Sequence, residues 1–164
     1  GIPREELKSK LKLAARVFNS VIHKLAADHA ITEYSIWLAK TNHEIKFNGA
    51  DQLKVKELMR RFEKNPYATP SVKECQSEAG EEVLNALIEL GELITVSQDV
   101  IFRKKDYDEM TGRIRAELKK NGLITLGETR DMLNTTRKYV QALLEHLDSI
   151  GVTQREGDAR KLRG

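Results

Sequence analysis

The chain has 164 residues, of which 40% are hydrophobic and 32% are charged, and its formal net charge is +3. This composition indicates a globular, helix-rich protein with room for one ordinary domain or two to three small ones, and the 5% of aromatic residues argues against a large β-sandwich. The single cysteine, Cys75, excludes an intrachain disulfide, and the apolar runs fall well short of the roughly 20 residues of a membrane span. Because the net charge is small, a nucleic-acid site would have to be a local basic patch.

Residues 1–47 form the first predicted unit. In order, it should contain a helix that opens at residues 3–7, a longer helix over 14–28, and hairpin strands at 31–38 and 44–47. Val17, Val21 and Leu25 give the longer helix an apolar stripe, which Phe18 and Ile22 widen. Tyr34 and Trp37 are expected in the core or between domains. The leading helix of the later units is missing here, so we expect the chain to be a piece of a longer protein.

Residues 48–104 form the second predicted unit. In order, it should contain a leading helix at 52–64, a helix start at residue 71, a longer helix between Gly80 and Gly91, and hairpin strands at 93–96 and 100–102. Ser71 and Glu74 fit a capping box, in which each side chain binds the backbone N–H of the other residue. The longer helix begins with Glu81 and Glu82, so it is acidic where a phosphate would have to lie. This unit is therefore interpreted as a spacer or a protein-contact module.

Residues 105–164 form the third predicted unit. In order, it should contain a leading helix at 107–120, a short strand at Ile124, a capping box at Thr125 and Glu128, a longer helix to about residue 149, and hairpin strands at 152–155 and 160–163. Asn134 or Thr135 is expected to cap the longer helix, whose buried stripe is Val140, Leu143, Leu144 and Leu147. The three units thus repeat one order of elements.

That order is typical of the winged-helix domain, a helix-turn-helix followed by a β-wing. Gly91 and Gly151 end the longer helix at the same point of their units, and His29 occupies that point in the first. The predicted fold class is therefore α+β, mostly α, built from tandem winged-helix domains. Short links between such units suggest an elongated arm.

Enzymatic chemistry has little support in the sequence. There is no P-loop, no Gly-x-Ser-x-Gly and no His-Glu-x-x-His motif. The four histidines are scattered, whereas a metal site needs clustered ligands. Paired acidic residues lie at helix starts, where the helix dipole explains them without a catalytic role. We therefore expect neither a catalytic site nor a metal site in this chain.

The third unit carries the strongest candidate for nucleic-acid binding, at the start of its longer helix. Thr135 and Thr136 offer hydroxyls and backbone N–H groups that suit phosphate oxygens. Arg137 suits a guanine edge or a phosphate, and Lys138 suits a phosphate. Tyr139 is interpreted either as a stacking platform for an unpaired base or as a residue that packs under the wing.

The predicted wing is also basic. Arg155, Arg160, Lys161 and Arg163 cluster on its strands, and strand alternation brings some of them to one face. Gly157 and Asp158 should form the turn, and the Asp158 carboxylate is an acceptor for a base amino group. Arg130, on the preceding helix, lies beside Asp131, so a local ion pair is the plain alternative to a nucleic-acid contact.

Three functions are compatible with this pattern: an RNA-binding module, a DNA-binding transcription regulator, and a protein-interaction scaffold whose basic residues are simply solvated. A regulator would usually be a symmetric dimer with basic recognition helices. Here one longer helix of three begins with a basic cluster. Nucleic-acid binding by the third unit is therefore favoured, and residues 105–164 are expected to bind with modest loss when residues 1–104 are deleted.

The run from Arg130 to Tyr139, followed by Leu144-Glu-His-Leu-Asp148, Ile150-Gly-Val-Thr153, Arg155 and Gly157-Asp158, resembles the C-terminal end of the bacterial selenocysteine-specific elongation factor. Asn134, Thr136, Gln154 and Ala142 depart from that family's pattern, in which Gly, Ser, Arg and Pro are frequent. The match is specific in this stretch and looser over residues 1–124.

The resemblance implies the C-terminal arm of a translation factor, with winged-helix domains that bind the selenocysteine insertion hairpin in mRNA through the last domain. By position, Arg137, Lys138, Tyr139, Arg155, Gly157, Asp158 and Arg160 would contact RNA, and Arg130, Thr136 and Lys161 complete the predicted surface. GTP and magnesium would belong to an N-terminal domain of the longer protein, as would the contacts to selenocysteinyl-tRNA and the ribosome. A cytoplasmic monomer without membrane contact is expected.

Overall fold

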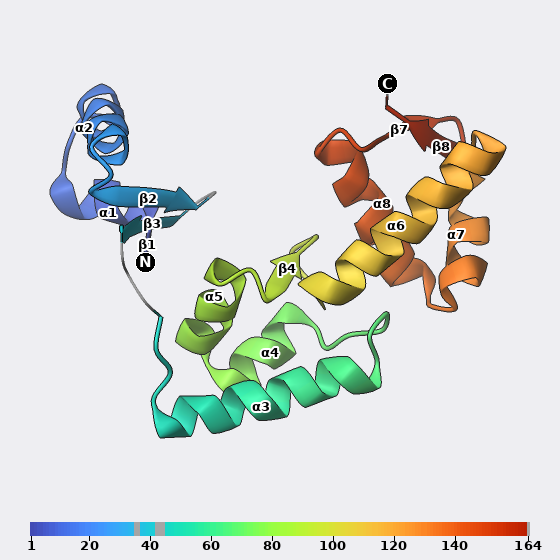
Figure 1. The fold of residues 1–164 in the computed structure, drawn as a ribbon, viewed down its shortest axis with the longest axis horizontal. Helices are drawn as coiled ribbons and strands as arrows, with labels where there is room; N and C mark the ends of the chain where they lie inside the picture. The colour runs from blue at the N-terminus through green and yellow to red at the C-terminus, as the bar shows by residue number, and fades with distance from the viewer. Residues whose placement is uncertain (35–36, 42–44, 164) are drawn as a thin grey trace. The chain divides into compact units, whose positions relative to one another are not determined.

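The structure is a computed structural model, and it describes residues 1–34, 37–41 and 45–163. The chain forms two compact units, an N-terminal unit at Gly1–Lys46 and a C-terminal unit at Phe47–Gly164 (Figure 1). In the part of the chain that the structure describes, no helix is both long and apolar enough to cross a membrane.

The N-terminal unit is a small helix pair with a three-stranded sheet. Its elements are β1 (Ile2–Pro3), α1 (Arg4–Leu11), α2 (Ala15–Ala27), β2 (Ile31–Tyr34) and β3 (Trp37–Lys40), and the sheet order is β1-β3-β2. Phe18, Ile22 and Leu38 form its buried core. Acidic residues in the first turn of α1 favour that helix start. The predicted helix-turn-helix with a wing is therefore present.

One expectation for this unit is wrong, and the apolar stripe of the longer helix is buried only in part. The second hairpin strand is β3, not residues 44–47: residue 44 lies outside the described residues, and Ile45–Phe47 are not in a strand. Val17, Val21 and Leu25 are 50%, 41% and 37% exposed. Phe18 and Ile22, one position further round the helix, are the buried pair because they face the sheet. The expectation for Tyr34 and Trp37 concerns side chains outside the described set.

Within the C-terminal unit, residues 48–104 are called the spacer module. Its elements are α3 (Gly49–Lys64), α4 (Val72–Ala79), α5 (Glu81–Glu89), β4 (Leu93–Thr95) and β5 (Ile101–Arg103). The predicted capping box at Ser71 and Glu74 is confirmed, and a bridge from Ser71 to Val100 stands where the other sheets have a third strand. Leu58, Phe62, Leu84, Leu87 and Ile101 are among the buried residues of its core.

Residues 105–164 of the same unit are called the terminal module. Its elements are α6 (Lys104–Asn121), β6 (Ile124–Thr125), α7 (Leu126–Leu133), α8 (Arg137–Ser149), β7 (Thr153–Glu156) and β8 (Ala159–Leu162), with sheet order β6-β8-β7. The capping box of Thr125 and Glu128 is confirmed. The predicted stripe on α8 is buried against Met110, Ile114 and Leu118 of α6.

The N-terminal unit and the terminal module repeat the same geometry at matching points. Ile2 pairs with Leu38 in one sheet as Ile124 pairs with Arg160 in the other. His29 and Gly151, each just after the longer helix, have φ angles of 55° and 75°. A left-handed residue ends the helix there in both cases, so the predicted equivalence of these positions is confirmed.

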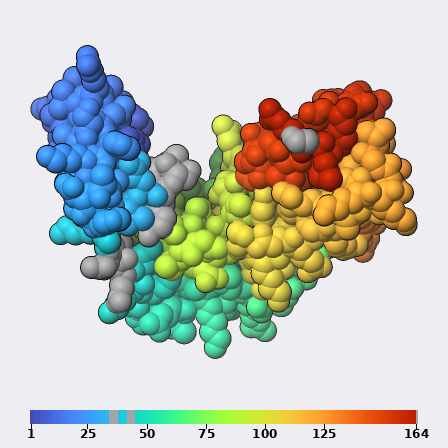
Figure 2. All heavy atoms as spheres, turned by 45° about the horizontal axis from the view of Figure 1, so that its top comes forward, coloured from blue at the N-terminus to red at the C-terminus, as the bar shows by residue number. Residues whose placement is uncertain are grey.

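The spacer and terminal modules share one hydrophobic core. Val96, Val100 and Phe102 of the spacer module are buried together with Ile114, Leu143 and Leu144 of the terminal module, among others. In Figure 2 the two modules form one continuous body, coloured from green to red. The wing of the spacer module therefore stabilises the module that follows it.

Candidate nucleic-acid interface

The start of α8 is the best-supported place for an anion. Thr136 is the cap residue, and it makes no side-chain hydrogen bond to the helix within the described chain. The backbone N–H groups of the first turn are thus available to an external acceptor. The expected cap at Asn134 or Thr135 is wrong, because Asn134, with a φ of 47°, ends α7 instead.

The charge of this helix start separates α8 from most of the other helices. Among the described helices, all except α2 and α8 carry an acidic residue in the first turn. The first turn of α8 instead carries Arg137 and Lys138. Positive side chains and the positive end of the helix dipole act together here, which favours a phosphate.

Arg137 is the least committed cation of the candidate surface. Its side chain is exposed, and among the described residues it has no hydrogen-bond or ion-pair partner. Arg130 is also exposed, but its guanidinium binds Asp131 at 2.7 Å, as the plain alternative predicted. An exposed pair of this kind is weak and exchanges readily with another anion.

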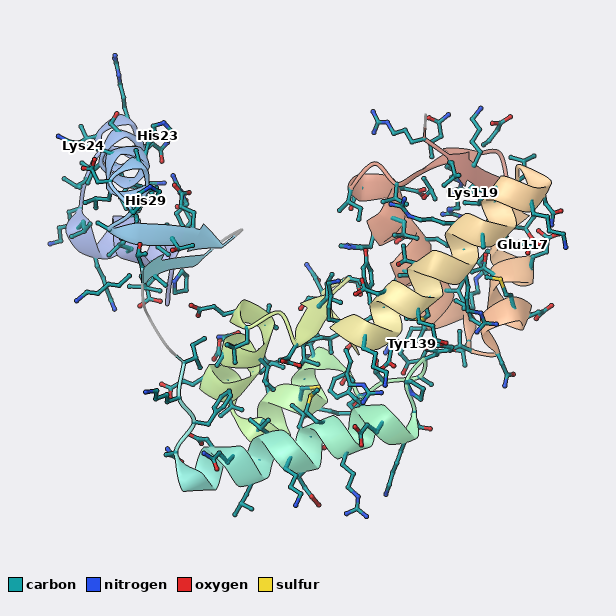
Figure 3. The ribbon with its side chains drawn as sticks, in the orientation of Figure 1. His23, Lys24, His29, Glu117, Lys119 and Tyr139 are labelled. Carbon is teal, nitrogen blue, oxygen red and sulfur yellow. The ribbon has the colours of Figure 1, made fainter. Side chains whose placement is uncertain are left out.

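Tyr139 and Thr135 are occupied by the spacer module. The Tyr139 hydroxyl donates to the carbonyl oxygen of Thr69 at 2.8 Å, and the Thr135 hydroxyl donates to the carbonyl oxygen of Tyr67 at 2.5 Å. The Tyr139 ring also lies 6.2 Å from that of Phe102. Figure 3 shows Tyr139 where the two modules meet. Of its two predicted roles, packing is observed, although the partner is the spacer module, and base stacking is not supported.

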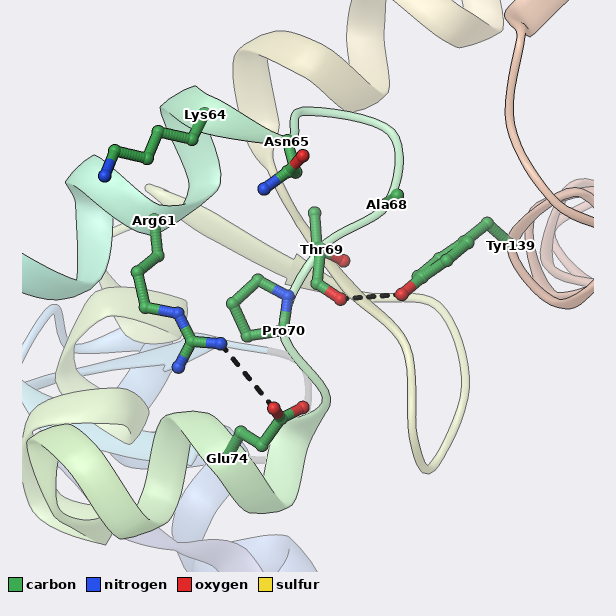
Figure 4. Close-up of a pocket in the computed structure, with 8 residues that line it drawn as sticks. All are labelled: Arg61, Lys64, Asn65, Ala68, Thr69, Pro70, Glu74 and Tyr139. Carbon is green, nitrogen blue, oxygen red and sulfur yellow. Dashed lines mark hydrogen bonds and ion pairs between the residues drawn. The ribbon is translucent and has the colours of Figure 1, made fainter.

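A polar hollow of about 400 Å³ lies beside this contact. Its lining includes Arg61, Lys64, Thr69, Glu74 and Tyr139, and Figure 4 shows the bond from Tyr139 to Thr69 across it. Arg61 already pairs with two carboxylates, Glu74 and Glu78. Because Arg61 is neutralised in this way and Glu74 itself lines the hollow, Lys64 is the one lining cation among the described residues that is left for an anion, and the hollow is a weak candidate for an anion site.

Lys138 is held by a carboxylate of the spacer module. Its ammonium group forms an ion pair with Asp99, and both side chains are about half exposed. The hydrogen bond to Asp99 raises the pKa of Lys138. The ammonium group also lies 5.6 Å from the centre of the Tyr139 ring. Lys138 thus reaches an RNA phosphate only in competition with Asp99.

The wing separates its predicted cations. Arg155 and Arg160 are directly opposite each other in the β7–β8 ladder, on the face that contains the buried Thr153. Arg160 is 5% exposed, and its guanidinium lies 3.2 Å from Asp148, which also accepts a 2.5 Å hydrogen bond from Thr153. Arg160 is therefore an internal strut between the wing and α8, which argues against its predicted contact with RNA.

The remaining wing residues are placed for solvent. Arg155 is exposed and donates to the carbonyl oxygen of Gly157, which has a φ of 61° and forms the tight turn with the exposed Asp158. Lys161 lies on the other face and pairs with Glu156 at 2.5 Å. Of the four predicted wing cations, Arg155 and Arg163 are thus the two that are exposed and have no carboxylate partner among the described residues.

Sequence reasoning missed the acidic and backbone partners that decide which cations are available. Asp99 and Asp148 each neutralise a predicted RNA-binding cation, and the loop at residues 65–70 engages the start of α8. Its Asn-Pro-Tyr-Ala-Thr-Pro sequence predicts a break between helices, with no sign of its contact across 68 residues of chain. Metal-binding clusters of three or more ligands are absent from the described residues.

Comparison with known proteins relates two regions of the chain to one family. Two family models, each described as the winged helix of elongation factor SelB, match residues 1–39 and 116–162. A selenocysteine-specific elongation factor of Desulfomicrobium baculatum is 35% identical over 82 residues, which are 50% of this chain and 13% of that protein. One from Haemophilus influenzae is 23% identical over 148 residues, 87% of this chain and 24% of that protein. The chain therefore spans a quarter or less of the length of these relatives.

Two solved structures share the fold. The mRNA-binding domain of elongation factor SelB from E. coli, solved in complex with SECIS RNA, superposes with a TM-score of 0.58 at 24% identity, over 72% of this chain and all of that one. The bacterial selenocysteine-specific elongation factor EF-Sec gives a TM-score of 0.58 at 17% identity, over all of this chain and 26% of that one. At these identities the likeness establishes the tandem winged-helix fold.

Proposed function

Since the chain belongs to the family of elongation factor SelB winged-helix domains, we propose that it binds an mRNA hairpin as part of a selenocysteine-specific elongation factor. The ligand class follows from the E. coli relative solved with SECIS RNA. The observation that carries the proposal on this chain is the uncapped, basic start of α8 with the exposed Arg137.

The contact surface that we propose is smaller than the sequence indicates. Its centre is Arg137 with the first-turn N–H groups and the Thr136 hydroxyl, and Arg155 with the Gly157–Asp158 turn extends it. Lys138, Arg130 and Lys161 take part by exchanging a carboxylate for a phosphate. The base edges of an RNA duplex are poorly accessible to side chains, so specificity would come from bases in the hairpin loop.

The wider activity belongs to a longer protein. The matched regions are winged-helix domains rather than a catalytic domain. We propose that GTP and magnesium binding, the contacts to selenocysteinyl-tRNA and the ribosome, and action in the cytoplasm are properties of the whole factor. No cofactor is assigned to this chain.

A titration of residues 1–164 with three nucleic acids tests the proposal. The ligands are a selenocysteine insertion hairpin, the same hairpin with its loop sequence changed, and a DNA duplex of equal length. We expect the intact hairpin to bind best, with the loop change weakening binding by tenfold or more, about 1.4 kcal/mol. Equal binding of all three would reduce the function to general polyanion binding, and tighter binding of the duplex would favour a DNA-binding regulator.

A further inference from the structure

Lys138, at the start of α8, forms an ion pair with Asp99 of the spacer module, and this pair bears on how tightly RNA can bind. Asp99 lies in the turn between β4 and β5, at the tip of the spacer module's wing, and its carboxylate pairs with Lys138 in the first turn of α8. Both side chains are about half exposed. An external phosphate can therefore approach Lys138 and compete for it.

The turn holds Asp99 firmly in that place. The Ser97 hydroxyl accepts hydrogen bonds from the backbone N–H groups of Asp99 and Val100, at 3.4 Å and 3.1 Å. The carbonyl oxygen of Asp99 accepts from the N–H of Val72 at 3.3 Å. Val100, the next residue, is 2% exposed in the core that the two modules share. The carboxylate is thus presented by a backbone fixed on both sides.

We propose that Asp99 sets the affinity and the salt dependence of hairpin binding, by occupying Lys138 as an internal substitute for an RNA phosphate. The proposal rests on the proposed function, because the competing ligand is the hairpin's backbone. The spacer module would then influence RNA recognition through the negative charge of Asp99. It would do so without binding RNA itself, because the first turn of its helix α5 is acidic and unsuited to a phosphate.

The direction of the effect follows from electrostatics. A phosphate can bind Lys138 only when the exposed ion pair with Asp99 breaks. The free energy of RNA binding is therefore reduced by the free energy of that ion pair. High salt weakens that internal pair as well as the RNA contact. The wild-type affinity should therefore fall less steeply with salt than it would if Asp99 were neutral.

The test compares Asp99→Asn, Lys138→Met and the double variant in the intact chain, with Glu57→Gln as a matched control. Glu57 is an exposed glutamate on α3 of the same module, so its change removes one negative charge that is not part of the ion pair with Lys138. The ligand is the selenocysteine insertion hairpin, and the dissociation constant is measured at several salt concentrations from about 0.05 to 0.2 M, where phosphate contacts dominate the change. Circular dichroism verifies that each variant is folded.

We expect Asp99→Asn to bind the hairpin roughly two- to fivefold more tightly, the range of an exposed ion pair. Its slope of log affinity against log salt should be steeper, by up to about 0.7–0.9, the value of one phosphate contact. Lys138→Met should weaken binding, the double variant should match Lys138→Met, and Glu57→Gln should match the wild type.

Unchanged affinity and slope in Asp99→Asn would overturn the proposal, as would weaker binding, which would make Asp99 a support for Lys138 rather than its competitor. An equal gain in Glu57→Gln would reduce the effect to net charge and also overturn it. Failure of the wild type to bind the hairpin would instead contradict the proposed function, and this inference with it.

Discussion

Individual cations of this chain differ mainly in what already neutralises them. Arg137 and Arg160 are both arginines of the terminal module. Arg137 is exposed, whereas Arg160 is buried, with 5% of its surface exposed, and pairs with Asp148. Removing the charge of Arg160 would leave the Asp148 carboxylate, which is 23% exposed, without its charged partner, which destabilises the fold. Removing that of Arg137 exposes no such group. The two residues therefore have separable roles in stability and in binding.

His146 gives a prediction at the same scale. Its ring packs edge-on against Tyr107, with centroids 5.6 Å apart, and burial lowers its pKa. The unfolded chain then takes up a proton more readily than the folded one below pH about 6.5, the ordinary histidine value, so the free energy of unfolding should fall as the pH drops through that region. We expect His146→Phe, which keeps an aromatic ring, to flatten this dependence.

Urea unfolding followed by circular dichroism at pH values above and below that of histidine measures the effect. His23→Phe serves as the control, because His23 is an exposed histidine on α2. The same loss of stability at the lower pH in wild type and His146→Phe would show that other groups are responsible.

At the scale of elements, equivalent positions of α2 and α8 lie in different surroundings. Val21 of α2 is 41% exposed, whereas Leu143, at the matching place in α8, is 1% exposed against α6. The apolar stripe predicts burial at both positions, because periodicity reports an amphipathic face. Periodicity alone does not show whether another helix packs on that face. In the part of the chain that the structure describes, α6 covers the face of α8, and Val21 of α2 remains exposed.

We predict that Leu143→Ala lowers the free energy of unfolding of the C-terminal unit by about 2–5 kcal/mol, the cost of a cavity in a packed core. Val21→Ala should change stability by less than about 0.5 kcal/mol, as a surface substitution does. Chemical denaturation of both variants provides the measurement. Comparable losses would mean that the α2 face is as tightly packed as that of α8.

How much of the fold and of the candidate site could be predicted depends on how far apart in the sequence the interacting residues lie. The capping boxes at Ser71 and Thr125 were predictable because their partners lie three residues away. The strand expected at residues 44–47 was wrong, because an alternating pattern over four residues is a weak signal. Contacts such as Tyr67 with Thr135 join segments 68 residues apart, and a single sequence holds no local mark of them.

At the scale of the whole molecule, the spacer and terminal modules depend on each other. Val96, Val100 and Phe102 complete the terminal module's core, and Thr69 and Tyr67 hold the start of α8. A domain of fewer than about 70 residues rarely has more than 3–5 kcal/mol of stability, and losing a buried phenylalanine alone costs about as much. The sequence-based expectation that residues 105–164 bind almost normally alone is therefore revised.

We predict that residues 47–164 keep the hairpin affinity of the full chain within about threefold, which is about 0.6 kcal/mol. The reason is that the proposed contact surface lies in the terminal module. Residues 105–164 should unfold at a markedly lower urea concentration and lose most binding. Parallel urea melts and hairpin titrations of the two fragments decide this. A stable, fully binding fragment of residues 105–164 would show that the shared core is dispensable.

The hairpin affinity of Arg137→Ala, set beside that of Arg60→Ala, tests the central claim most directly. Both residues are exposed arginines within a helix, Arg60 lying on α3 of the spacer module, so the two variants match in the charge removed. If α8 begins the RNA-binding surface, Arg137→Ala should cost about 1–3 kcal/mol of binding free energy, the range of a specific base contact, while Arg60→Ala stays close to wild type. Equal affinities for the two variants would contradict the account and place the RNA elsewhere on the chain.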